Sequence, residues 1–103
     1  MCSKTLPILY DFWASWCGPC KVIAPYVETL AKTFEGQLVL QKVNVDEDPD
    51  LAIRFEVRSV PTLVLVDGEK ELVRTVGGMP LAVLELKIKT ALEELLDKAP
   101  EPT

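Results

Sequence analysis

The chain has 103 residues, of which 49% are hydrophobic and 26% charged, and its net charge at neutral pH is −5. This length accommodates one domain with its own core, and this composition excludes a disordered or fibrous protein. The acidic balance, with lysine and arginine scattered along the chain, excludes nucleic acid and an anionic membrane surface as expected partners.

The first residues, MCSKTLPILYDF, carry no signal-peptide cleavage pattern, and no apolar run in the sequence reaches the length of a membrane span. We therefore expect a cytoplasmic protein. Residues 7–13 form a short apolar and aromatic run, typical of a central strand that is covered on both faces. Asp11 is the exception within this run.

The segment that follows Cys17 and Cys20 repeats apolar side chains at helical spacing. It predicts a helix that ends near Gly36, a residue suited to a C-terminal cap. Pro25 lies inside the pattern and is expected to kink the helix. The apolar positions are Val22, Ile23, Tyr26, Val27, Leu30, Ala31 and Phe34.

The second half of the chain predicts a strand, a short helix, a hairpin and a long helix. Residues 37–45 have strand character, and the acidic turn DEDPD favours a short helix through Phe55. PTLVLV and ELVRTV predict a β-hairpin around a turn at residues 67–70. Apolar residues then recur at helical spacing. They are Leu81, Leu84, Ile88, Leu92 and Leu95.

The expected order of elements is β-α-β-α-β-β-α. A β-α-β unit followed by a second helix, a hairpin and a last helix predicts an α/β fold. Its four-stranded mixed sheet would have helices on both faces. We expect a single domain over residues 1–103, with a tail at residues 1–5 and another at residues 99–103.

Two of the three cysteines form a CGPC motif. Three unevenly spaced cysteines are too few for the disulfide framework of a small secreted domain, so this pair is more typical of redox chemistry or metal binding. Cys17 is expected at a helix N-terminus, where unpaired N–H groups and the helix dipole favour a thiolate nucleophile. Cys20, one turn inside the helix, can resolve the mixed disulfide that Cys17 forms.

Two other roles for the pair are weaker. A zinc site needs two more ligands, and because the chain has no histidine these would be Cys2 plus a carboxylate, or residues of a second copy. An inert buried pair is disfavoured because Gly18 and Pro19 favour an exposed turn. We therefore expect no metal site.

Three segments, YDFWASWCGPCKVIAP, KVNVDEDPDLAIRFEVRSVPTLVLVDG and VGG, closely resemble thioredoxins, in register over residues 7–77. The resemblance implies a minimal thioredoxin fold and a general protein-disulfide reductase. It implies that disulfide-containing client proteins are the substrates, that a thioredoxin reductase recharges the protein, and that the redox-active Cys17–Cys20 disulfide is the only redox group, without a cofactor. It also implies that Trp16, Gly18 and Pro19 form the rim of the site.

Val60, Pro61 and Thr62 resemble the family's cis-proline loop. An X-Pro bond is the only peptide bond that adopts the cis form at modest cost. The resemblance implies that the Val60 backbone pairs with an extended client strand beside Cys17. On local sequence alone, Pro61 fits the first position of a strand equally well, and the resemblance favours the functional role.

A glycine pair, Gly77 and Gly78, follows the predicted hairpin. Residues without a Cβ atom let a client backbone approach closely. Trp16, Val60 and Met79 are expected to form an apolar rim around that contact.

Asp11 lies six residues before Cys17 on the predicted central strand, so we expect its carboxyl group beneath the disulfide. Burial there would raise the pKa of Asp11 above its usual value of about 3.9. A carboxylate with a raised pKa can take the proton of Cys20 at neutral pH. Lys42 matches the family's partner for this acid, although by itself it also fits a solvated strand residue.

Some features depart from the usual thioredoxin pattern. Only ten residues precede Asp11, so the chain resembles a short form without the usual N-terminal strand and helix. Residues 37–45 would then lie at an exposed sheet edge. We expect a monomer. Cys2 has no counterpart in the family and is expected to be an exposed thiol without a role, and a regulatory or dimer-forming disulfide is the alternative.

Two other functions stay open on the sequence alone. The chain fits a thioredoxin-like binding or chaperone module whose cysteines are incidental, and it fits a reductant dedicated to one client. Pro19 stands where disulfide isomerases often carry histidine, which favours the reducing members of the family.

Overall fold

A computed structural model describes residues 5–97 of the chain. Its elements follow the predicted order, which confirms the α/β fold class. The predicted tails and Cys2 lie outside the described residues, apart from Thr5. The elements are β1 (Ile8–Trp13), α1 (Gly18–Thr33), β2 (Val39–Asn44), α2 (Pro49–Arg54), β3 (Thr62–Asp67), β4 (Lys70–Val76) and α3 (Leu81–Asp97).

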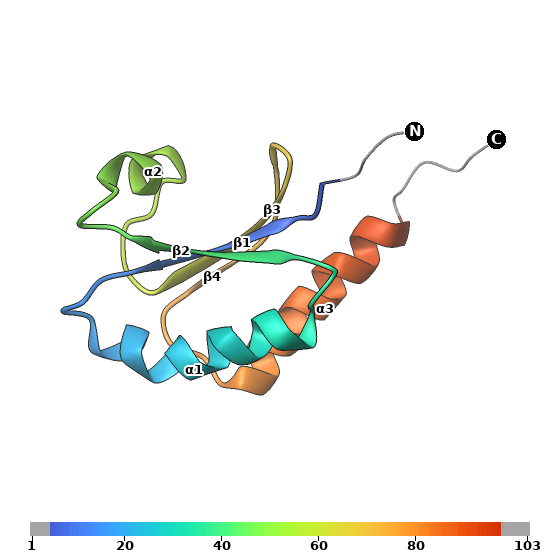
Figure 1. The fold of residues 1–103 in the computed structure, drawn as a ribbon, viewed down its shortest axis with the longest axis horizontal. Coiled ribbons are helices and arrows are strands. Elements are labelled where there is room, and N and C mark those ends of the chain that lie inside the picture. The colour runs from blue at the N-terminus through green and yellow to red at the C-terminus, as the bar shows by residue number, and fades with distance from the viewer. Residues whose placement is uncertain (1–4, 98–103) are drawn as a thin grey trace.

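A four-stranded mixed sheet with the order β2-β1-β3-β4 forms the centre of the molecule (Figure 1). β1 pairs parallel with β2 and antiparallel with β3, and β3 pairs antiparallel with β4. β1 and β3, the two most buried strands, are therefore central. Within the described part of the chain, β2 lies at an edge, as the sequence predicts.

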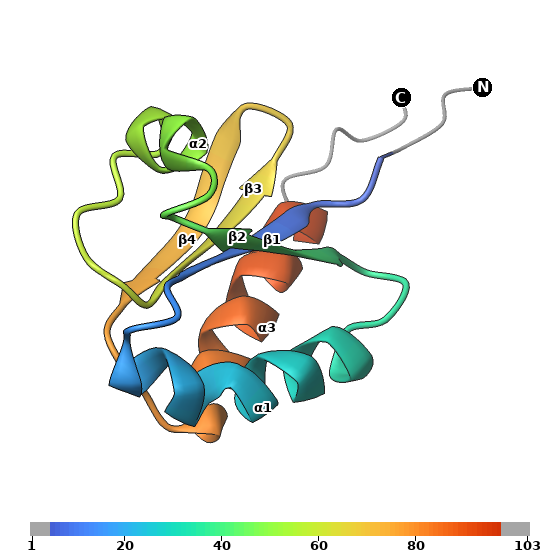
Figure 2. The same ribbon diagram turned by 60° about the vertical axis from the view of Figure 1, so that its left-hand side comes forward.

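Helices cover both faces of this sheet. α1 and α3 pack together on one face, and α2 lies on the other (Figures 1 and 2). Side chains of β1 alternate between the two layers, because successive strand residues point to opposite faces. Leu9 belongs to the core under α1 and α3, and Phe12 belongs to the core under α2. Asp11, two residues after Leu9, therefore points toward the α1 side.

The first helix ends slightly earlier than its apolar stripe predicts. Its last residue is Thr33, and the N–H of Phe34 closes the final turn by bonding to the Leu30 carbonyl at 3.0 Å. Gly36 lies beyond the helix with a φ of +85°, a conformation that glycine adopts without steric cost. The helix continues through Pro25, and the kink expected there stays a prediction.

The predicted hairpin is present, with a tighter turn than the four residues 67–70. Because the strand ladder extends to the pair of Asp67 and Lys70, only Gly68 and Glu69 form the connection. Gly68 has a φ of +64°, as two-residue hairpin turns commonly require.

Candidate active site at the Cys17–Cys20 pair

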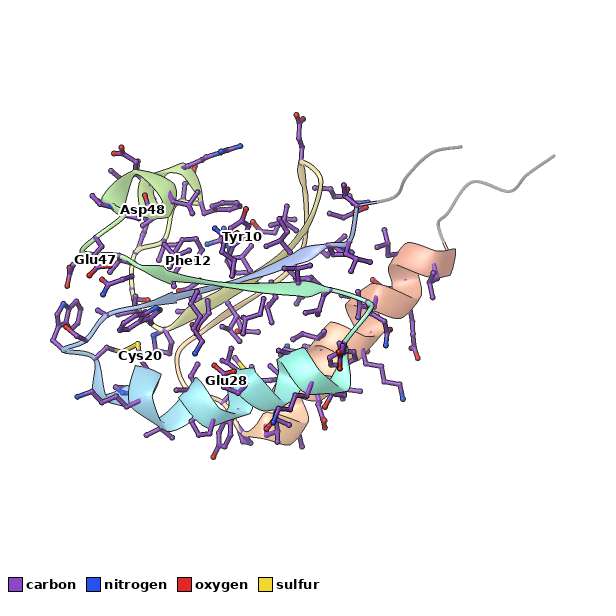
Figure 3. The ribbon with its side chains drawn as sticks, in the orientation of Figure 1. Tyr10, Phe12, Cys20, Glu28, Glu47 and Asp48 are labelled. Atoms are coloured by element: carbon purple, nitrogen blue, oxygen red, sulfur yellow. A yellow bond between two sulfur atoms is a disulfide. The ribbon has the colours of Figure 1, made fainter. Side chains whose placement is uncertain are left out.

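Cys17 and Cys20 form a disulfide at the start of α1, and their Cα atoms are 5.3 Å apart. Both residues are buried, with exposed fractions of 4% and 6%, which is more burial than an exposed turn suggests. The intervening Gly18 and Pro19 are exposed. Figure 3 shows Cys20 at the amino end of α1, close to the end of β1. The side chains packed against the pair belong to Trp13, Val45 and Val60.

Cys17 is the N-cap residue of α1. Its backbone is extended, and its Sγ accepts a hydrogen bond from the Cys20 N–H, with a nitrogen–sulfur distance of 3.1 Å. The first turn carries no acidic residue that would repel a negative sulfur. Pro19 lacks an N–H at a position where a helix has no internal partner for one, so it does not interrupt the helix. A helix N-terminus of this kind favours negative charge on a cysteine sulfur once the disulfide is reduced.

Asp11 and Cys20 line one pocket of about 190 Å³. Asp11 is 5% exposed. Among the described residues, Oδ1 of Asp11 and Nε1 of Trp13 are buried without a hydrogen-bond partner, and both residues line this pocket. A buried polar atom without a partner is costly, so these two atoms mark the pocket as chemically unusual.

Burial raises the pKa of Asp11 from its usual 3.8 to about 6, because the surrounding protein solvates a carboxylate poorly. The positive charge of Lys42 acts against this rise, and the negative charge of Glu28 adds to it. The direction of the shift agrees with the expectation from the sequence.

Lys42 lies directly opposite Asp11 in the parallel register of β1 and β2, and it lines the same pocket. Its ammonium group forms an ion pair with Glu28 of α1. A direct Asp11–Lys42 ion pair is absent among the contacts of the described residues. Lys42 therefore acts on Asp11 through its charge rather than through a hydrogen bond.

Trp16 is 68% exposed beside the disulfide. Its indole Nε1–H donates a hydrogen bond to Oδ2 of Asp46 at 2.9 Å. The backbone N–H of Asp46 in turn donates to Oδ1 of Asn44, also at 2.9 Å. The loop after β2 thus holds the Trp16 ring in place at the rim.

The Val60–Pro61 peptide bond is cis, as the resemblance implies. Val60 packs against the cysteine cluster. The Thr62 hydroxyl is buried and donates to the Ser59 carbonyl at 2.7 Å, and the Gly77 N–H donates to the Pro61 carbonyl at 2.9 Å. These bonds fix the loop beside the cysteines and connect it to the glycine pair.

The glycine pair lies against the CGPC turn. Gly77 has a φ of +89°, and a Cβ atom added at Gly78 would lie 4.0 Å from Cβ of Pro19. Met79 is half-buried and lines an open groove together with Pro19 and Gly78. The predicted rim residues therefore surround the disulfide from several segments of the chain.

Two charged residues at the site were not expected from the sequence, Glu28 and Asp46. Asp46 lies two residues after the end of β2, in the acidic turn that the sequence predicts there, and this position could have indicated it. Glu28 faces Lys42 only because α1 packs across the parallel β1–β2 pair, and this requires the tertiary structure.

Within residues 5–97, no group of three or more histidine, cysteine, aspartate or glutamate side chains has an arrangement that would hold a metal ion. None of the helices in the same range is long and apolar enough to cross a membrane.

Comparison with known proteins identifies the family. A family model described as "Thioredoxin" matches residues 2–90. "Thioredoxin 1" from Chlorobaculum tepidum is 46% identical over 90 residues, which are 87% of this chain and 89% of that relative. This chain belongs to the thioredoxin family. A second thioredoxin relative, "Thioredoxin 1" from Nostoc sp., is 41% identical over 93 residues, covering 90% of this chain and 79% of the relative.

The fold is that of thioredoxins as well. A solved structure described as "Structure of a malarial protein" superposes with a TM-score of 0.78 and 30% identity, covering 85% of this chain and 99% of the other. The protein is therefore a thiol-disulfide oxidoreductase of thioredoxin type, a protein-disulfide reductase with a redox-active cysteine pair.

Proposed function

We propose that Cys17 is the attacking residue and Cys20 the resolving residue of this reductase. In the dithiol form, the Cys17 thiolate bonds to one sulfur of a client disulfide and expels the other as a thiolate. Cys20 then loses its proton, and its sulfur attacks Sγ of Cys17, which breaks the bond to the client. The client leaves reduced by two electrons, and the protein is left with the Cys17–Cys20 disulfide.

The observation that carries this assignment is the hydrogen bond from the Cys20 N–H to Sγ of Cys17 at 3.1 Å. The same donor stabilises a negative sulfur on Cys17 before attack, together with the positive end of the helix dipole. Cys20 lies inside the first turn, where its own sulfur has no comparable backbone donor among the described residues.

We further propose that Asp11 is the base that accepts the Cys20 proton, and that Lys42 adjusts its basicity. Three observations support this role: the pocket shared by Asp11 and Cys20, the unpaired Oδ1 atom, and the pKa of about 6. A base whose pKa lies close to the working pH is the most effective at proton transfer.

The exposed surface around Cys17 is proposed to bind the client. An extended client segment would lie along the Val60 backbone, with an apolar contact from the Trp16 ring and space for its own backbone at the glycine pair. The support is that these segments meet around one disulfide. The proposed client-binding residues are Trp16, Gly18, Pro19, Val60, Pro61, Thr62, Gly77, Gly78 and Met79.

The chain is proposed to act as one domain and as a monomer in the cytoplasm, carrying electrons from a thioredoxin reductase to disulfide-containing clients. No metal or organic cofactor enters the proposed cycle, because disulfide exchange requires only the two cysteines. The relatives of this chain are themselves named thioredoxins, which supports a partner reductase in general terms.

Reduction of insulin by dithiothreitol tests the proposed roles. The wild-type chain should accelerate insulin precipitation, and Cys17→Ser should reduce the rate to that of dithiothreitol alone. Cys2→Ser is the matched control, because it removes the one cysteine outside the motif, and it should retain the wild-type rate. Unchanged turnover in Cys17→Ser would favour the alternative, a binding or chaperone module whose motif cysteines are incidental.

A further inference from the structure

Three charged side chains from three elements lie around the pocket beside Cys20: Asp11 of β1, Lys42 of β2 and Glu28 of α1. We propose that Glu28 is a positioning residue that holds the Lys42 ammonium group away from Asp11, and thereby keeps the Asp11 carboxylate unpaired for proton transfer. This inference rests on the proposed role of Asp11 as the base for Cys20.

The register of the strands makes Lys42 the natural partner of Asp11. The two Cα positions are directly opposite each other in a parallel pair, so both side chains point to the same face of the sheet. Lys42 nevertheless pairs with Glu28, and Oδ1 of Asp11 has no partner among the described residues. The ammonium group of Lys42 can therefore pair with either of two carboxylates, that of Asp11 or that of Glu28.

The position of Glu28 follows from the periodicity of α1. Lys21 and Ala24 line the pocket, and Glu28 comes one turn after Ala24 on the same side of the helix. Cys20 and Glu28 lie along the same helix on the α1 side of the sheet, whereas Tyr10 and Phe12 lie toward α2 (Figure 3).

The ion pair contributes little to folding. The side chains of Lys42 and Glu28 are 42% and 54% exposed, and ion pairs at such exposed positions are worth at most a small stabilisation. The main consequence of the ion pair is therefore the position of the Lys42 positive charge. The hydrogen bond from Lys42 lowers the pKa of Glu28, whereas burial raises the pKa of Asp11, so Glu28 loses its proton at lower pH than Asp11 does.

The electrostatic directions agree with this role. The charge of Lys42 lowers the pKa of Asp11, and the charge of Glu28 raises it. If Glu28 becomes neutral, Lys42 loses its exposed partner and turns toward Asp11, so both changes lower the pKa of Asp11. At neutral pH the carboxylate is already mostly ionised, and a lower pKa makes it a weaker acceptor for the Cys20 proton.

Other groups that face Asp11 do not duplicate this effect. From α1, the pocket receives Lys21 and the sulfur of Cys20, which becomes a titrating thiol in the dithiol form together with Cys17. On the β3 side, the residue opposite Asp11 is the apolar Leu63. Lys32 lies near Glu28 and also favours its ionised form.

A double-mutant cycle tests the inference in the oxidised full-length protein, where the cysteines do not titrate. The readout is the titration midpoint of the Asp11 carboxyl carbon by NMR. Glu28→Gln should lower the midpoint by about one unit, and Lys42→Gln should raise it. In the Lys42→Gln background, Glu28→Gln should lower it by less than half as much, because Glu28 acts through Lys42. The matched control Glu71→Gln removes an ion pair at the opposite edge of the sheet and should leave the midpoint unchanged.

An unchanged midpoint in Glu28→Gln, or an equal shift with and without Lys42, would overturn the inference. The proposed base role has a separate readout, the rate at which the mixed disulfide on Cys17 resolves. Glu28→Gln should slow this step about threefold at pH 7, as expected for a base weakened by about one unit with a Brønsted coefficient near one half. If Asp11→Asn resolves at the wild-type rate, the base role fails, whatever the midpoints of the Glu28 variants.

Discussion

Asp11 and Lys42 lie directly opposite each other on neighbouring parallel strands, and within the described residues no ion pair connects them. The acid is buried, has an unpaired oxygen, and has its pKa raised to about 6. Because folding gains nothing from an unpaired buried carboxylate, this arrangement fits a residue retained for proton transfer.

The first prediction concerns the stability of Asp11→Asn. The folded pKa of about 6 lies above the unfolded value of 3.8, so between these values the native state holds a proton that the unfolded state has released. The contribution of Asp11 is therefore fully present below about pH 4 and is lost as the pH rises to about 6. Asp11→Asn should gain about 3 kcal/mol relative to wild type between pH 4 and pH 8.

Urea unfolding of both proteins at about pH 4 and pH 8 measures this difference. The variant should at the same time reduce insulin more slowly at pH 8, because Cys20 has lost its base. A stability difference between the two proteins that does not grow with pH would show that Asp11 is a satisfied structural acid.

The second prediction concerns the hydrogen bond from Trp16 to Asp46. Asp46→Ala removes the acceptor and should raise the KM for insulin by up to about fivefold, since one such bond contributes about 1 kcal/mol. Asp46→Asn keeps an oxygen acceptor and serves as the control, with a KM close to that of wild type. Equal KM values for Asp46→Ala and wild type would mean that the position of the ring does not affect client binding.

The third prediction compares the two glycines of the rim. Gly77→Ala places a Cβ atom on a residue with a φ of +89° and should destabilise the fold by about 1 to 2 kcal/mol. Gly78 has no such φ, and its added Cβ would make only an ordinary contact with Pro19, so Gly78→Ala should be nearly neutral. Urea unfolding of both variants measures this difference in stability. Equal stabilities would mean that the positive φ of Gly77 does not require glycine.

Much of the fold follows from local sequence patterns. Alternation and apolar runs predict all four strands, and the apolar stripe after Cys20 predicts α1. The end of α1 at Thr33 was less predictable, because Phe34 continues the stripe as a cap residue and not as part of the helix. The sequence predicts a four-residue hairpin turn, which is longer than the turn in the structure. Asp67 and Lys70 have turn-forming character but pair with each other in the strand ladder.

The cysteine chemistry was likewise accessible from spacing, because a helix start brings residues three apart onto one face. The ion pair between Lys42 and Glu28 was not predictable from the sequence. It depends on how α1 crosses the sheet, which no local pattern encodes. The hydrogen bond from Trp16 to Asp46 joins residues 30 positions apart. It also depends on the tertiary structure, so local sequence does not predict it.

The central claim is that Cys17 attacks and Cys20 resolves, and trapping tests it most directly. The reduced Cys20→Ser variant, mixed with a disulfide-containing protein such as insulin, should accumulate a covalent adduct through Cys17, because the motif then has no resolving thiol to release the client. Cys17→Ser should accumulate almost none. Intact-mass and peptide mass spectrometry identify the linked residue: an adduct on Cys17 is the predicted result, and an adduct that forms through Cys20 in the Cys17→Ser variant would contradict the account.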